Sequence, residues 1–343
     1  MVKSNYTTIA LLIGAVVFLL FTSSADAQWT VRKKFAFEQN RRLGRGVNII
    51  GYDPRWKDST KGRMQEKHFA LIKKAGFNNV RIVISPFRFS MNDTTFTINP
   101  SFFNTLDWAI QEALKNKLMA IVDFHEHIAM GKDPLGNKPK FLSMWKQIAE
   151  HCKGYSNDVL FEIANEPNMA PEIWNQIHSE AYGVIRQSNP GRTLVIGTIY
   201  GNQIKYLKDL ILPEDDRNII VAIHYYSPIQ FTHQGAPWSE KNKDLKGIEW
   251  KGTSEEINAV EEDFNIANVW AKKHNRPLTL GEFGAYEKAD MDSRLRWTNN
   301  IARQAERRKW SWSYWQFDSD FVVYDMEKDE WKFNLLNALI PGK

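Results

Sequence analysis

Eight short apolar segments alternate with amphipathic stretches along most of the chain, and this alternation limits the folds open to it. Short apolar runs are typical of buried strands, and amphipathic stretches are typical of surface helices. Eight strands separated by helices form a parallel sheet that closes most simply into a (β/α)8 barrel. The predicted strands are Gly46–Ile50, Asn79–Ile84, Met119–Asp123, Val159–Ala164, Thr193–Gly197, Ile219–His224, Pro277–Gly281 and Ser311–Trp315. The predicted helices include Glu66–Ala75, Leu106–Asn116, Phe141–Cys152, Ile173–Gln187, Glu255–Lys273 and Ser293–Arg308.

The length of the chain fits one such barrel with loop insertions better than two domains. The chain has 343 residues, of which 43% are hydrophobic, and a (β/α)8 barrel needs about 250 residues. We therefore predict a single-domain α/β protein, a TIM barrel that occupies residues 28–343. An open doubly wound sheet is the alternative. It would usually carry a G-x-G-x-x-G turn after its first strand, and residues 46–51 do not follow that pattern.

Residues 1–27 have the features of an export signal. Lys3 gives the positive start, Ile9–Phe21 is apolar, and Ala25-Asp26-Ala27 has the small-x-small form of a cleavage site. The apolar stretch is short for a membrane span, which needs about 20 residues, although an uncleaved anchor is the alternative. We expect a monomer that begins near Gln28, is secreted to the extracellular or periplasmic space, and makes no membrane contact after cleavage.

Charge and aromatic content bear on whether the partner is a nucleic acid or a polysaccharide. The net charge is only +5, with Lys and Arg scattered among Asp and Glu, so the basic stripe of a nucleic-acid-binding protein is missing from the sequence. The 13 tryptophans are more informative, because the flat C–H faces of sugars stack on aromatic rings. A polysaccharide is the expected partner, and nucleic acid is not.

Two glutamates follow predicted strands in short motifs. They are Glu166 in Ile163-Ala164-Asn165-Glu166-Pro167 and Glu282 in Leu280-Gly281-Glu282-Phe283-Gly284. The C-terminal ends of barrel strands carry the active sites of this fold. Two carboxyl groups that converge there are the minimum equipment for hydrolysing a glycosidic bond. The alternative is that each is an ordinary surface glutamate at a junction between strand and loop.

An ordered series of strand-end motifs gives the chain a family resemblance. The series contains Asn79-Val80-Arg81-Ile82, Asp123-Phe124-His125, Asn165-Glu166-Pro167, His224-Tyr225-Tyr226, Gly281-Glu282-Phe283 and Tyr314-Trp315. From about Arg45 to Pro341 the chain resembles the family 5 glycoside hydrolases, which include cellulases and mannanases. Within that family, residues 231–238 and 281–286 are similar to broad-specificity endoglucanases.

The resemblance implies a role for each motif residue. It implies retention of configuration, with Glu166 as acid/base and Glu282 as nucleophile, and needs no cofactor or metal. It also implies a set of substrate-binding or nucleophile-contacting residues: Arg81, His125, Asn165, His224, Tyr226, Trp315, and, in a neighbouring sugar subsite, Trp238 and His233. Structural alternatives are an ion pair for Arg81, a backbone-bonded buried tyrosine for Tyr226 and a core position for Trp315. Weaker candidates for sugar contacts are Trp56, Phe87, Tyr200 and Trp250.

The chain departs from the family pattern after the third predicted strand. Many relatives have a second histidine directly after the one that matches His125, whereas this chain has Glu126 and then His127. His-x-His at a barrel strand end is also an amidohydrolase metal signature, with His224 as a possible third ligand. A metal-dependent hydrolase is therefore one alternative, and a carbohydrate-binding barrel without catalysis is another. The first expectation remains a retaining endo-β-1,4-glucanase, with β-mannanase or xyloglucanase activity as the alternative within the same chemistry.

Overall fold

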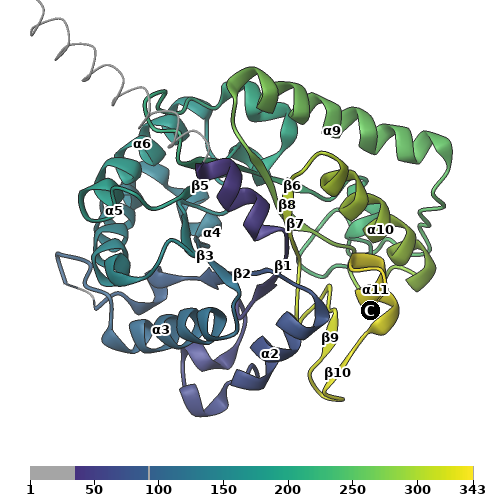
Figure 1. Ribbon diagram of the computed structural model, residues 1–343, viewed down its shortest axis with the longest axis horizontal. Coiled ribbons are helices and arrows are strands. Elements are labelled where there is room, and N and C mark those ends of the chain that lie inside the picture. The colour runs from purple at the N-terminus through teal and green to yellow at the C-terminus, as the bar shows by residue number, and fades with distance from the viewer. Residues whose placement is uncertain (1–34, 92, 343) are drawn as a thin grey trace, which may run out of the picture.

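Eight parallel strands close into a barrel in sequence order in the computed structural model, which describes residues 35–91 and 93–342 (Figure 1). This confirms the predicted fold class, while the predicted export signal lies outside the described residues. The strands are β1 Arg45–Ile49, β2 Asn79–Ile84, β3 Met119–Phe124, β4 Val159–Glu162, β5 Leu194–Gly197, β6 Ile219–Tyr225, β7 Leu278–Phe283 and β8 Ser311–Tyr314.

Helices surround the barrel, and several begin earlier than their apolar periodicity predicts (Figure 1). Three of the helices that begin early have a proline in the first turn, at Pro100, Pro134 and Pro171. Proline lacks a backbone N–H, but an N–H in the first turn has no acceptor within the helix, so no hydrogen bond is lost. None of the helices in the described ranges has the length and apolar composition needed to cross a membrane. The helices are α2 Glu66–Ala75, α3 Pro100–Lys115, α4 His127–Lys132, α5 Pro134–His151, α6 Pro171–Ser188, α7 Ile199–Asn202, α8 Ile229–Thr232, α9 Ser254–His274, α10 Met291–Arg307 and α11 Phe333–Leu339.

The two ends of the barrel are built differently. Residues 35–43 form a helix, and its buried Ala36 and Leu43 join a cluster with inward-facing strand side chains. The other members of that cluster are Met119, Ile121, Leu160, Val195, Ile220 and Ala222. This apolar plug fills the N-terminal end. The opposite end carries the loops that follow the strands, including a hairpin of β9 Tyr324–Asp325 and β10 Glu330–Trp331 that the sequence analysis did not predict.

Candidate active site

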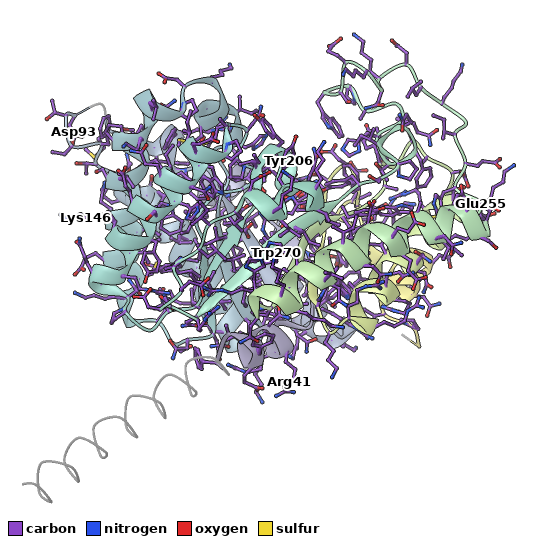
Figure 2. All side chains as sticks on the ribbon, turned by 90° about the horizontal axis from the view of Figure 1, so that it is seen from above. Arg41, Asp93, Lys146, Tyr206, Glu255 and Trp270 are labelled. Carbon is purple, nitrogen blue, oxygen red and sulfur yellow. The ribbon has the colours of Figure 1, made fainter. Side chains whose placement is uncertain are left out.

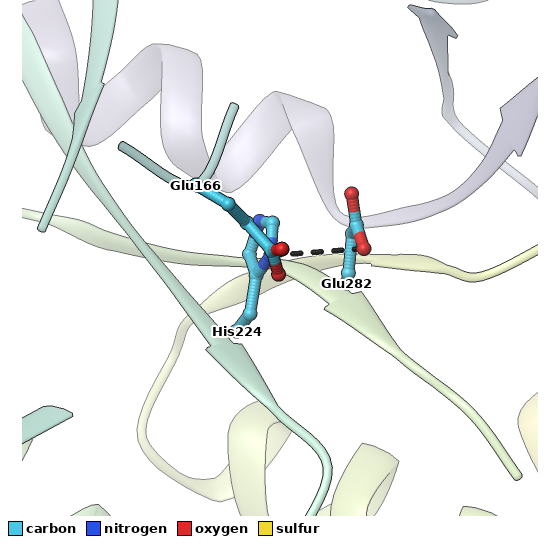
Figure 3. A group of neighbouring side chains, drawn as sticks. All are labelled: Glu166, His224 and Glu282. Carbon is cyan, nitrogen blue, oxygen red and sulfur yellow. Dashed lines mark hydrogen bonds and ion pairs between the residues drawn. The ribbon is translucent and has the colours of Figure 1, made fainter. Parts of the chain in front are cut away.

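Glu166, His224 and Glu282 converge at the C-terminal end of the barrel (Figure 3). One ligand atom from each of the three side chains lies within 4.8 Å of the others, so the two carboxylates approach to within that distance. His224 Nδ1 lies 2.8 Å from a Glu166 oxygen and 3.7 Å from a Glu282 oxygen. The histidine therefore lies between the two acids.

Local irregularities in the backbone produce this convergence. Strand β4 ends at Glu162, before the predicted Ala164, and Glu166 then adopts a left-handed φ of 42°. Glu282 was predicted to follow its strand but lies within β7. A shift of register between Ile223 and His224 pairs His224 with Glu282 on that neighbouring strand.

Arg81 is completely buried and donates hydrogen bonds to four of the side chains around it. Its guanidinium donates to Glu282 over 2.8 Å, to the Asn165 side-chain oxygen over 2.8 Å, and to Asn48 over 2.8 Å. The predicted contact between Arg81 and Glu282 is therefore present. Asn48 was not among the predicted site residues, although it lies in the first predicted strand.

Two further carboxylates share the Arg81 charge, and neither was among the predicted site residues. Glu162 accepts two hydrogen bonds from the guanidinium, of 2.6 and 3.0 Å, and Asp123 lies 3.1 Å from it. Burial raises the pKa of Asp123 to about 7 and raises the pKa of Glu162. The available signal was an acidic residue inside an otherwise apolar strand, since charged groups are rarely buried without a partner.

The Glu282 carboxylate is held at both oxygens. Arg81 donates to one oxygen, and the Tyr226 hydroxyl donates to the other over 2.9 Å. Burial raises the pKa of Glu282, while His224 and Arg81 act in the opposite direction. Burial also lowers the pKa of His224 to about 4, so this imidazole is neutral near pH 7.

His125, Asn165 and Trp315 form one wall of the site. The His125 ring stacks on Trp315 with centroids 5.6 Å apart and an interplanar angle of 12°. His125 Nδ1 lies 2.7 Å from Asp123, and its Nε2 lies 3.3 Å from the Asn165 side-chain nitrogen. The structure thus places these three predicted residues together, with the exposed Tyr52 edge-on to Trp315.

The residues that depart from the family pattern lie beside this wall. Glu126 accepts a hydrogen bond from the Phe87 N–H over 2.8 Å, and burial raises its pKa to about 7. The His125 and His127 ring centroids are 5.1 Å apart. In the described part of the chain, the one group of three potential metal ligands is Glu166, His224 and Glu282, which includes neither of these histidines. His224, the possible third ligand of the alternative metal site, is thus grouped with the two glutamates and not with His125 and His127.

Trp238 and His233 belong to the segment between α8 and α9, which rises beside Glu255 on the side of the molecule away from Arg41 (Figure 2). The His233 ring lies 5.0 Å from the Tyr226 ring and so borders the site directly. Trp238 lies farther out, half exposed, with its ring edge-on to Tyr286 at 4.9 Å. Of the weaker sugar-contact candidates, Trp250 is wrong, because it is buried in the core.

Comparisons with known proteins identify the family of the chain. The sequence model described as "Cellulase (glycosyl hydrolase family 5)" matches residues 41–320. Endoglucanase H of Acetivibrio thermocellus is 31% identical over 320 residues, which cover 89% of this chain. Cellodextrinase A of Ruminococcus flavefaciens is 25% identical and is matched over 93% of its length. The chain spans only 34% of Endoglucanase H and 54% of Endoglucanase 3 of Fibrobacter succinogenes.

The fold also has a counterpart among solved structures. The crystal structure of the endoglucanase Cel5A from Thermotoga maritima superposes with a TM-score of 0.84 at 41% sequence identity, covering 89% of this chain and 99% of that one. The sequence match extends over most of the barrel, from the helix before β1 to the loop after β8. It therefore includes every strand that contributes to the carboxylate cluster, and the chain belongs to glycoside hydrolase family 5.

Proposed function

We propose that the protein is a secreted retaining endo-β-1,4-glucanase in which Glu282 is the nucleophile and Glu166 the acid/base. The observation that carries the proposal is the approach of the two carboxylates to within 4.8 Å. Retaining enzymes hold their carboxyl groups about 5–5.5 Å apart, whereas inverting enzymes need about 6.5–9.5 Å to admit a water molecule. The observed separation favours direct attack by a carboxylate.

The surroundings of each acid fit different roles. Glu282 is oriented by Arg81 and Tyr226 and is almost fully buried, as expected for a group that attacks from one fixed direction. The Glu166 side chain is 25% exposed and can reach a glycosidic oxygen and then a water molecule. In the first step Glu282 would attack the sugar carbon while Glu166 protonates the departing oxygen. In the second, Glu166 would deprotonate the water that cleaves the glycosyl-enzyme ester.

The wall of the site supplies plausible sugar contacts. The Trp315 ring stacks on His125, and Asn165 is fixed by Arg81. A hydrogen bond from this amide to the sugar 2-hydroxyl would strengthen as positive charge develops in the transition state. No metal or cofactor takes part in the proposed steps.

Glucan is the preferred substrate in this proposal, and mannan is the second candidate. Relatives carry the names endoglucanase and cellodextrinase. The Cel5A of Thermotoga maritima has been crystallised with cellobiose and with mannotriose, which supports mannan as the alternative. The test is the release of reducing sugar from carboxymethylcellulose, mixed-linkage β-glucan, xyloglucan and mannan side by side. Activity on mannan alone would overturn the glucanase proposal.

Secretion and the monomeric state remain part of the proposal. The signal-like pattern of residues 1–27 supports export to the extracellular or periplasmic space. The proposed mature chain would begin near Gln28 and include the barrel. N-terminal sequencing of exported protein checks the cleavage site, and sedimentation analysis of the same material checks the monomer.

The raised pKa of Glu282 predicts where activity is lost in acid. For an activated aryl cellobioside, we expect kcat/KM to fall at low pH with a midpoint above about 4.3, the ordinary glutamate value. Glu282 must be ionised to attack, and burial raises its pKa, so the active form is lost as the pH falls through that raised value. The profile of kcat/KM reports groups of the free enzyme. A midpoint at or below 4.3, in protein that circular dichroism shows to be folded, would contradict the prediction.

Trp238→Ala is expected to weaken binding of long substrates. The Trp238 ring is half exposed and is therefore accessible to a sugar. Stacking would contribute about 1–3 kcal/mol to the binding free energy, by analogy with stacking of nucleic-acid bases on aromatic rings. We expect KM to rise for β-glucan and to change little for a short aryl glycoside. Phe333→Ala, which removes an exposed ring from α11, is the matched control. Equal losses on long and short substrates together with a lower Tm would show that Trp238 only packs its loop.

A further inference from the structure

The short element α7 after β5 is a strained turn and not a regular helix, and it approaches the candidate acid/base. Tyr200, Gly201 and Asn202 are three successive residues in the left-handed region, with φ values of 51°, 83° and 51°. Tyrosine rarely adopts this conformation, and runs of such residues are concentrated at functional sites. The Tyr200 N–H donates to the Pro167 carbonyl over 2.6 Å, which ties the turn to the residue after Glu166.

The turn places the Asn202 side chain next to His224. Asn202 is fully buried, and its side-chain nitrogen lies 3.1 Å from His224 Nε2. Glycines on two strands make room for this pair. A Cβ on Gly197 of β5 would lie 2.2 Å from the Asn202 side-chain oxygen, and a Cβ on Gly281 of β7 would lie 2.9 Å from His224 Nε2.

This contact determines which nitrogen of the neutral imidazole carries the proton. The Asn202 amide presents its nitrogen to His224, while its oxygen has no hydrogen-bond partner among the described residues. An amide nitrogen can only donate, so in this orientation His224 Nε2 accepts and the proton is on Nδ1. Nδ1 is the atom that lies 2.8 Å from Glu166. His224 therefore donates to one oxygen of Glu166, and an acidic proton on Glu166 must occupy the other oxygen.

The opposite tautomer would have a different effect. With its proton on Nε2, His224 would offer an unprotonated Nδ1 that accepts the Glu166 proton and directs it away from the substrate. We propose that Asn202 is a positioning residue that fixes the Nδ1–H tautomer of His224 and so keeps the Glu166 proton available to the glycosidic oxygen. The consequence for catalysis rests on the proposed acid/base function of Glu166, but the tautomer itself does not.

The tautomer can be measured without any assay of activity. Long-range ¹H–¹⁵N correlation spectra of protein labelled at its eight histidines distinguish protonated from unprotonated ring nitrogens, and His224→Gln identifies the His224 signals. At neutral pH we expect Nδ1 to be protonated and Nε2 unprotonated in the wild type. A protonated Nε2 in the wild type would overturn the proposal, whatever the enzyme hydrolyses.

Asn202→Asp tests the consequence for catalysis. Aspartate has the same shape and tolerates the left-handed backbone, but its carboxylate would draw the histidine proton to Nε2. We expect kcat on β-glucan to fall about tenfold or more. The upper limit is the loss of about 10⁴-fold known for a catalytic histidine in the wrong tautomer. The first step on dinitrophenyl cellobioside, which needs little protonation, should be nearly retained.

Gln203→Glu is the matched control, because it adds the same charge to the exposed neighbouring position on the turn. An equal loss in both variants, or an equal loss on both substrates in Asn202→Asp, would overturn the positioning role. If Asn202→Asp does not fold, Asn202→Gly keeps the left-handed backbone and removes the amide, and the same substrate split is expected. A wild-type enzyme that cleaves no β-glycan would refute the proposed function instead and leave the spectroscopic result standing.

Discussion

Glu282→Ala is expected to abolish turnover of β-glucan, with a loss on the order of 10⁴-fold or more by comparison with other catalytic nucleophiles. The mutation removes the group that attacks the sugar carbon but leaves Arg81 paired with Glu162 and Asp123. The free energy of unfolding should therefore change little, as measured by thermal denaturation. Loss of activity with an unchanged Tm would separate chemistry from folding.

Azide provides a sharper readout of the same variant. The small anion can occupy the space vacated by Glu282 and attack an activated aryl glycoside from the same side. We expect partial recovery of activity and an α-glycosyl azide product, because a single displacement inverts the β-linkage. Glu287→Ala, which removes an exposed carboxylate five residues later, should behave like the wild type. A β-glycosyl azide from Glu282→Ala would indicate that Glu282 is the acid/base.

Glu166→Ala is expected to separate substrates by their need for protonation. Hydrolysis of β-glucan, whose leaving group is a sugar alkoxide, should fall by about 10²–10⁴-fold. Formation of the glycosyl-enzyme from dinitrophenyl cellobioside should survive, because that leaving group departs without a proton. The comparison requires pre-steady-state kinetics on the aryl substrate and reducing-sugar release from the polymer.

The anomeric configuration of the azide product again identifies the role of the mutated residue. In Glu166→Ala, azide should attack the glycosyl-enzyme after Glu282 has reacted, and two displacements give a β-glycosyl azide. Glu172→Ala, at an exposed position in the first turn of α6, is the control for loss of a nearby carboxylate. Equal losses on polymer and aryl substrate would contradict the assignment of Glu166 as the acid/base.

Much of the fold was predictable because its signal is local. Each barrel strand is a short, mainly apolar run, so the eight strands and their order could be found in the sequence. Most motif residues follow or end such a run, whereas Arg81 lies inside one. The boundaries were less accurate. Pro134 starts α5 seven residues before the predicted Phe141, because a helix start depends on capping and backbone restriction as well as on apolar spacing. Glu282 lies inside β7 because pairing with β6 extends that strand.

The sequence by itself determined the barrel, the family and the two glutamates, since strand periodicity and short motifs are properties of neighbouring residues. The tertiary structure alone decided which polar and charged groups surround them. Arg81 faces Glu162 and Asp123 as well as Glu282, and Asn202 reaches His224 from a left-handed turn on another strand. These contacts join residues far apart in the chain, and their strength depends on burial and on distances of about 3 Å, which only the closed barrel fixes.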